Sequence, residues 1–348
     1  MANTDILFER RGGIGLITLN RPSALNALTH AMTAKMHSML RTWEGDEAVV
    51  AVVVRGAGDR AFCAGGDIQA LYRARGDNLD WSYRFYWDEY RLNAYIQHYA
   101  KPYVALIDGI VMGGGVGVSV HGSHRVVTEK ALFAMPETGI GLFPDIGGTY
   151  FLPRCPGEIG MYLGLTGARL GAGDSVFAGV GTHHVPSGRL DALTEALAAN
   201  PAEPDAIMDH HAETAEDGFL PKLRHEIDAA FAADSLEAIL IALAADPSPW
   251  AGKTLDIMRA KSPTSLKIAF RQLREGRSLS FDECMKLEYR LVCRFMQGDD
   301  FYEGIRAAVV DKDRQPRWRP ATIEAVAEIE HYFAGLGTRE LNLESLGA

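Results

Sequence analysis

Short apolar runs alternate along the first 185 residues with segments in which apolar side chains recur at helical spacing. Residues 29–43 show the helical spacing most clearly. The β-branched run at residues 49–54 has few polar interruptions, which is typical of a strand covered on both faces. The predicted strands are residues 6–8, 14–19, 49–54, 103–107, 125–128 and 182–185. Because the order strand, strand, helix, strand recurs, we predict a mixed α/β fold.

The pattern beyond residue 185 is helical. The composition changes near Pro186, after which Ala, Asp, Glu, His and Pro dominate as far as Gly252. We predict three regions on this basis: a core at residues 1–185, a helical insertion or linker with an open role at residues 186–260, and a helical C-terminal region at residues 261–348. The helices expected in the C-terminal region are residues 267–273, 281–296 and 322–333.

Composition and charge narrow the classes of protein that the chain can belong to. Its 348 residues are 47% hydrophobic and 23% charged, as in an ordinary globular protein with a sizeable core. The net charge of −10 argues against a general nucleic-acid binder, which needs a basic face. No apolar stretch is long enough to span a membrane. The four cysteines form no CxxC pair and residues 1–11 show no targeting signal, so we expect a cytoplasmic location.

Two glycine-rich turns are the first candidates for binding chemistry. Gly65-Gly66 and Gly113–Gly115 each follow an apolar stretch and precede a segment that is compatible with a helix. Glycine lets a ligand approach the backbone closely, and the start of a helix presents free N–H groups. Asp67 is the natural N-cap of the first of these helices. Together the two turns could bind one oxyanion from two sides.

Three carboxylates are candidates for the chemistry itself. Glu137 and Asp145 lie in loop sequence rich in Gly and Pro, about twenty residues after the second glycine turn. Glu89 lies within residues 80–99, a predicted helix that is dense in aromatic residues. The local pattern favours a solvated helix face for Glu89, and a charge that points into a pocket is the alternative.

Other familiar signatures fit the sequence less well. The glycine run lacks the third Gly of the dinucleotide-binding fingerprint. Ser119 does not lie in the G-x-S-x-G turn of a serine hydrolase. The histidines lack the cysteine or acidic spacing of a metal site, so we interpret them as structural or surface residues. No metal site is expected.

The two glycine segments together resemble a known family. FCAGGDI at residues 62–68 and MGGGVG at residues 112–117 are similar to the crotonase, or enoyl-CoA hydratase/isomerase, superfamily. Residues 113–122, 133–148 and 262–313 resemble, more narrowly, its 3-hydroxyisobutyryl-CoA hydrolase branch. The resemblance runs from about residue 6 to residue 318. It implies a spiral of repeated ββα units, with a mostly helical C-terminal region that completes or covers the active site.

The resemblance also implies roles for individual residues. The backbone N–H groups that hold the thioester oxyanion in this family fall on Gly66 and Gly114. The acyl-CoA would be lined by Gly66, Asp67, Ile68 and Gln69. The carboxylates that contact the substrate would be Glu89, Glu137 and Asp145. Hydratases of the superfamily carry a second glutamate where this chain has Gly117, and its absence favours thioester hydrolysis, since adding water to a C=C bond needs a second acid or base there.

We therefore expect a hydrolase that releases CoA and 3-hydroxyisobutyrate, a reaction of valine catabolism, with Glu137 as nucleophile or general base. Two alternatives stay open: a hydratase or isomerase acting on a short-chain enoyl-CoA, and a non-catalytic acyl-CoA-binding or assembly protein. No cofactor is expected, because CoA is part of the substrate. The expected partner is a small acyl-CoA, with neither nucleic acid nor membrane, and self-association into a homo-oligomer is left open.

Overall fold

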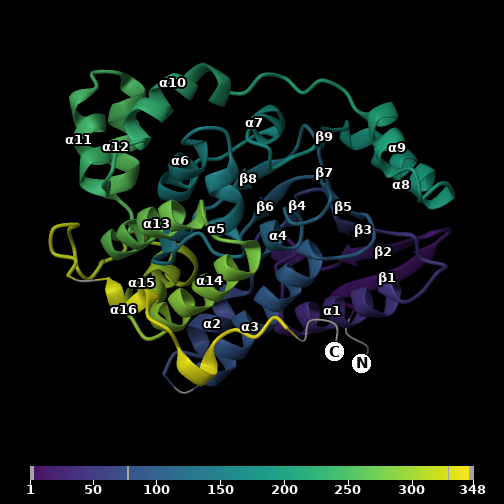
Figure 1. The fold of residues 1–348 in the computed structure, drawn as a ribbon, viewed down its shortest axis with the longest axis horizontal. Helices are drawn as coiled ribbons and strands as arrows, with labels where there is room; N and C mark the ends of the chain where they lie inside the picture. The colour runs from purple at the N-terminus through teal and green to yellow at the C-terminus, as the bar shows by residue number, and fades with distance from the viewer. Residues whose placement is uncertain (1–3, 77, 328, 345–348) are drawn as a thin grey trace.

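The computed structural model describes residues 4–76, 78–327 and 329–344, and its core contains two β-sheets (Figure 1). The larger sheet has the strand order β1-β2-β3-β5-β7-β9, and the smaller has the order β4-β6-β8. β1 and β2 form an antiparallel hairpin, and all the other paired strands are parallel. The strands are β1 (Ile6–Arg11), β2 (Ile14–Leu19), β3 (Ala51–Gly56), β4 (Ala61–Cys63), β5 (Tyr103–Ile107), β6 (Ile110–Met112), β7 (His124–Val127), β8 (Leu132–Ala134) and β9 (His183–His184).

Each repeat of the core contributes one strand to each sheet. β3, β5 and β7 belong to the larger sheet, and the short strands that follow them, β4, β6 and β8, form the smaller one. This arrangement confirms the predicted α/β fold of repeated ββα units. The three-residue strands of the smaller sheet were not predicted, because an element of that length shows no measurable period.

Two helices of the core begin at a side-chain cap that the sequence provides. α1 (His30–Glu44) is capped by the Thr29 side chain, and α2 (Ile68–Arg73) by the predicted Asp67, whose carboxylate accepts from Ala70 N. α3 (Leu79–Gln97) carries the aromatic residues, and α4 is only the turn Gly114–Gly117. Three further helices follow: α5 (Gly148–Phe151), α6 (Ile159–Thr166) and α7 (Ala172–Phe177).

Residues 186–260 form five α-helices that pack against two different parts of the core (Figure 1). α8 and α9 cover the outer face of the larger sheet, where Leu193 and Met208 pack in one cluster with Val53 and Val104. α10 and α12 contact α6 instead. The five helices are α8 (Leu190–Ala199), α9 (Pro204–His211), α10 (Leu220–Phe231), α11 (Leu236–Ala245) and α12 (Pro249–Arg259). Part of the role left open for this region is therefore to cover the sheet.

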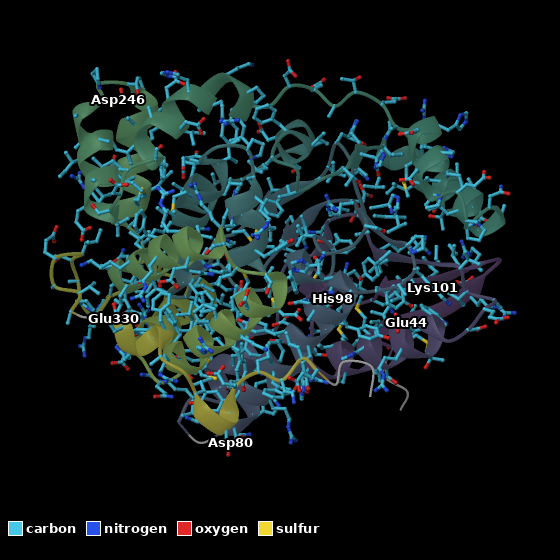
Figure 2. The ribbon with its side chains drawn as sticks, viewed as in Figure 1. Glu44, Asp80, His98, Lys101, Asp246 and Glu330 are labelled. Atoms are coloured by element: carbon cyan, nitrogen blue, oxygen red, sulfur yellow. The ribbon has the colours of Figure 1, made fainter. Side chains whose placement is uncertain are left out.

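The C-terminal region returns to the core. Its elements are α13 (Pro263–Gly276), α14 (Phe281–Phe295), α15 (Asp300–Ile305), a π-helix at Arg306–Val310 and α16 (Glu330–Phe333). α14 packs along α3, and His98 at the end of α3 pairs with Asp282 at 2.7 Å; His98 is labelled in Figure 2. None of the described helices is long and apolar enough to cross a membrane.

The helix predicted at residues 322–333 is wrong over most of its length. Only α16 forms there, and residue 328 lies outside the described residues. Ile323 and Val326 are buried through a single turn closed by the hydrogen bond from Val326 N to Ile323 O at 3.1 Å. Apolar residues three apart fit one turn as well as they fit a helix, so their spacing could not distinguish the two.

Candidate active site

One cleft of about 660 Å³ lies between the core and the C-terminal region. Its walls include all the residues predicted for the site: Gly66, Asp67, Ile68, Gln69, Glu89, Gly114, Glu137 and Asp145. Val309 and Lys312 of the C-terminal region of the same chain also line it. The structure thus brings together residues from four separate segments of the core and places the C-terminal region over them.

The two glycine turns meet at one end of this cleft. Gly65 and Gly113 have φ values of +113° and +45°, which side chains rarely adopt, so the sharp turn before each helix requires glycine. A Cβ atom at Gly114 would lie 3.3 Å from the backbone N of Gly66. Gly114 is also the first residue of α4, so its N–H has no acceptor within the helix. The two backbones are close enough for their N–H groups to serve one oxygen atom.

Glu137 begins a 3₁₀ helix (Glu137–Ile140) directly after Pro136 and is 4% exposed. Its Oε2 atom is buried and makes no hydrogen bond to a described residue. Burial raises the pKa of Glu137 well above its usual value, the charge of Asp145 raises it further, and the Lys261 ammonium lowers it. The raised pKa means that burial favours the protonated acid. Once ionised, the desolvated carboxylate is reactive, because no solvent shell has to be removed from it before it attacks or takes a proton.

Asp145 faces the same cleft and is 4% exposed. The Tyr90 hydroxyl donates a hydrogen bond to Asp145 Oδ2 at 2.9 Å. Burial raises the pKa of Asp145 to about 7, although the Tyr90 hydrogen bond opposes the shift. Asp145 therefore changes protonation near neutral pH and can accept a hydrogen bond from a substrate hydroxyl group when ionised.

Glu89 is 2% exposed, so the solvated helix face favoured by its local pattern is wrong and the pocket-facing alternative is correct. Burial, followed by the charge of Asp145, raises the pKa of Glu89 to about 8. The adjacent Asp88 is the partly exposed carboxylate and lies 2.5 Å from His30 Nε2. Adjacent residues on a helix point in different directions, so Glu89 can be buried while Asp88 is partly exposed. In a helix rich in aromatic residues no clear polar face shows which of the two faces solvent.

Gly117 ends α4 and does not line the cleft. A Cβ atom at this position would lie 2.7 Å from Nδ2 of Asn93, a fully buried residue of α3. Asn93 therefore fills the space that a side chain at position 117 would need. Position 117 therefore has neither a carboxylate nor the space for one.

Sequence reasoning missed several residues around the cleft. Tyr90 donates a hydrogen bond to Asp145, and the Lys261 ammonium lowers the pKa of Glu137. In the sequence, Tyr90 is one of many aromatic residues in a predicted helix and Lys261 resembles an ordinary surface lysine. Lys312 lines the cleft in a left-handed conformation, with φ +58°, after the π-helix. Lys312 lies within residues 262–313, one of the segments that resemble the hydrolase branch. The local sequence does not predict a left-handed conformation for a lysine.

The comparisons with known proteins agree on the family. A family model described as enoyl-CoA hydratase/isomerase matches residues 14–333. The 3-hydroxyisobutyryl-CoA hydrolase, mitochondrial, of Gallus gallus is 46% identical over 97% of this chain and 91% of its own length. The protein of the same name from Homo sapiens is 44% identical over 98% of this chain and 91% of its own length.

Two solved structures are similar over nearly the whole chain. A carnitinyl-CoA dehydratase from Mycobacterium thermoresistibile is 43% identical with a TM-score of 0.94, and 98% of this chain and 99% of that one are covered. An enoyl-CoA hydratase from Rhodobacter sphaeroides 2.4.1 is 42% identical with a TM-score of 0.91, covering 97% of this chain and 100% of that one. The names of these relatives differ in the reaction, while all describe chemistry on CoA thioesters.

The relatives correct one expectation from the sequence. The curated hydrolases are named as mitochondrial, which contradicts the cytoplasmic location inferred from the cysteine pattern and from the absence of a targeting signal in residues 1–11. The cysteine pattern argues only against an oxidising compartment, so it could not specify the cytoplasm. The fold, the cleft and the relatives all indicate the same family. This chain belongs to the enoyl-CoA hydratase/isomerase family, that is, the crotonase superfamily.

Proposed function

We propose that this protein hydrolyses the thioester of 3-hydroxyisobutyryl-CoA and releases free CoA and 3-hydroxyisobutyrate. The observation that carries the proposal is the cleft, which combines two glycine turns with three buried carboxylates and has neither a carboxylate nor room for one at Gly117. The curated relatives that are 44% to 48% identical carry the name of this activity. The reaction belongs to valine catabolism.

The first step is the binding of the thioester carbonyl by the N–H groups of Gly66 and Gly114. Attack on this carbon turns the carbonyl oxygen into an oxyanion, and the two donors would be directed at it. One such donor is worth about 3 kcal/mol in the transition state of comparable enzymes. The close approach of the two backbones, 3.3 Å from Gly66 N to a Cβ position on Gly114, supports this role.

Glu137 then acts on the carbonyl carbon in its ionised form. As a nucleophile, its carboxylate oxygen forms a bond to this carbon, the C–S bond breaks and CoA leaves as a thiolate that takes up a proton. Water then cleaves the resulting mixed anhydride and restores the carboxylate. As a general base, Glu137 would instead take a proton from the attacking water. The Lys261 ammonium supports either route, since it lowers the raised pKa of Glu137.

Asp145 and Glu89 would bind the 3-hydroxyl group of the acyl chain. Both carboxylates line the cleft, and Tyr90 fixes one oxygen of Asp145 while the other can accept from the substrate. An acyl group without the hydroxyl would leave Glu89 Oε1, which has no hydrogen-bond partner among the described residues, unpaired, and this costs binding energy. The preference for a 3-hydroxyacyl group follows from this pair.

A hydratase acting on an enoyl-CoA is the second candidate, and the names of the two solved structures favour it. A hydratase must supply a second acid or base beside the C=C bond. The position used for that purpose in the superfamily is Gly117, which is closed by Asn93. The hydrolase is therefore the better-supported proposal.

Thiol release separates the candidates. Purified protein is incubated with 3-hydroxyisobutyryl-CoA, 3-hydroxypropionyl-CoA or crotonyl-CoA, and free CoA is followed with a thiol reagent while the conjugated absorbance of crotonyl-CoA is recorded. The hydrolase proposal predicts thiol release from the 3-hydroxyacyl substrates and a stable crotonyl-CoA absorbance. Loss of that absorbance without thiol would make the protein a hydratase, and binding without turnover of any thioester would make it a binding protein.

A further inference from the structure

Glu288 on α14 is a fully buried carboxylate to which the proposed reaction assigns no role. Its Oε2 atom accepts a hydrogen bond from Gly147 N at 2.8 Å, and its Oε1 atom accepts one from Thr149 N at 2.9 Å. Glu288 does not line the cleft. Both hydrogen bonds instead end on residues 144–149, called the loop below, which carry Asp145 and continue into the first turn of α5.

This loop has an unfavourable backbone conformation immediately after Asp145. Ile146 has a φ of +52° and Gly147 a φ of +88°. Glycine adopts such values freely, but a β-branched residue such as isoleucine does so only when the surrounding structure enforces it. The two amides bound by Glu288 lie one and three residues after Ile146, so the carboxylate binds the backbone next to this unfavourable conformation.

Two other side chains hold the same loop. Gln272 Nε2 on α13 donates to Pro144 O at 2.6 Å, and His121 Nε2 lies 2.7 Å from Ile146 O. The loop is therefore bound on each side of Asp145, with Glu288 and Gln272 both coming from the C-terminal region. This region contributes more than a cover for the cleft, because two of its helices fix the backbone that aims a carboxylate of the site.

We propose that Glu288 is a positioning residue for the reaction: by binding the amides of Gly147 and Thr149, it holds the loop so that the carboxylate of Asp145 meets the 3-hydroxyl group of the substrate. The proposal rests on the function proposed for Asp145. A carboxylate suits this task because it accepts a hydrogen bond at each oxygen. A glutamine at this position would turn its NH₂ group toward the N–H of Gly147 or Thr149, so that two hydrogen-bond donors would face each other.

The test compares 3-hydroxyisobutyryl-CoA with isobutyryl-CoA, which lacks only the hydroxyl group. We define the hydroxyl preference as the ratio of their kcat/KM values for thiol release. The full-length enzymes compared are wild type, Glu288→Gln, Asp145→Asn and the double variant. Glu158→Gln is the matched control, because Glu158 also ties the core to α13, through Arg274 and Arg277, without contacting the loop.

Glu288→Gln should lower the hydroxyl preference by about tenfold or more, since a displacement of about 1 Å in a reacting group can cost about 100-fold. Hydrolysis of isobutyryl-CoA should change by less than about threefold, and the double variant should match Asp145→Asn, because both changes remove one function. Glu158→Gln should keep the wild-type preference. If Glu288→Gln does not fold, Glu288→Asp, which shortens the side chain by one methylene, should lower the preference in the same way.

Two results would overturn the inference, and they differ from each other. If Asp145→Asn lowers the hydroxyl preference and the folded Glu288 variants do not, or if they slow both substrates equally, the function proposed for Asp145 stands and Glu288 has only a structural role. If Asp145→Asn itself leaves the preference unchanged, the proposed role of Asp145 fails, and the inference that rests on it fails too.

Discussion

The carboxylate of Glu89 lies directly against the backbone of Gly114. A Cβ atom at Gly114 would be 2.5 Å from Glu89 Oε1, which is closer than real Cβ contacts. A carboxylate from α3 therefore reaches the turn that presents one of the proposed oxyanion donors. Glycine is needed at this position because of the close approach.

Gly114→Ala should lower kcat strongly. The added methyl group must displace Glu89 or move the backbone N–H away from the oxyanion, and loss of one such donor costs about 100-fold to 1,000-fold in kcat. Steady-state thiol release measures the effect. Gly252→Ala is the control, because a Cβ atom on Gly252 in α12 would meet nothing within 4 Å. Equal values of kcat for the two variants would contradict the role of Gly114 as an oxyanion donor.

Glu89→Gln should stabilise the protein at alkaline pH. The pKa of Glu89 is about 8 in the folded protein against a usual 4.5, so between these values the folded state retains a proton that the unfolded chain has released. The stabilising effect of that proton is complete below about pH 4.5 and is lost as the pH rises through about 8. Glutamine does not ionise, so nothing is lost in the variant.

Denaturant unfolding at about pH 5 and about pH 9 checks this linkage. At the higher pH the variant should exceed wild type by more than about 1 kcal/mol, because one pKa unit corresponds to about 1.4 kcal/mol. At the lower pH the difference should shrink. A constant difference at both pH values would show that Glu89 is not the titrating group.

The sequence indicated the large elements of the fold and most of the candidate site. A continuous β-branched run predicted β3, a short apolar stretch predicted β5, and the cap at Asp67 was correct to the residue. Turns that need glycine and acidic residues in a Gly/Pro-rich loop are local features, and the cleft contains both. These features could be predicted because each depends on the residues next to it in the sequence.

Properties set by distant contacts could not be predicted. The burial of Glu89 depends on helices that pack over it from elsewhere in the chain, and the tether from Glu288 to Gly147 joins residues 141 positions apart. Lys312 reaches the cleft only because a π-helix and a left-handed backbone turn it there. No periodic pattern contains information of this kind.

Lys312→Ala should weaken binding of the CoA portion without slowing the chemistry. The chain carries a net charge of −10, so phosphate-bearing CoA needs local cations, and Lys312 lines the cleft. KM for 3-hydroxyisobutyryl-CoA should rise several-fold, with little change in kcat and a weaker dependence on salt.

The truncated N-acetylcysteamine thioester, which has no phosphate, should show the same kinetics with the variant as with wild type. Arg314→Ala is the matched control, since Arg314 also has a left-handed backbone and is exposed outside the cleft lining. A rise in KM for both thioesters, or the same rise in the control, would count against a role in phosphate binding.

Gly117→Ala should destabilise the protein, because its methyl group would lie 2.7 Å from Asn93 Nδ2. Overpacking of this kind costs about 1 to 3 kcal/mol. Combining it with Asn93→Ala should recover part of the loss, so the two changes should be non-additive in the free energy of unfolding. Additive effects would mean that Asn93 does not close this position.

The most direct test of the account is thiol release from 3-hydroxyisobutyryl-CoA by Glu137→Gln. The variant keeps the size of the side chain but can neither attack the thioester nor take a proton from water. We predict that it releases less than about 1% of the free CoA released by wild type, by analogy with the loss of other catalytic groups, while calorimetry shows that it still binds the acyl-CoA. Substantial thiol release by the folded variant would contradict the assignment of Glu137 and, with it, the proposed mechanism.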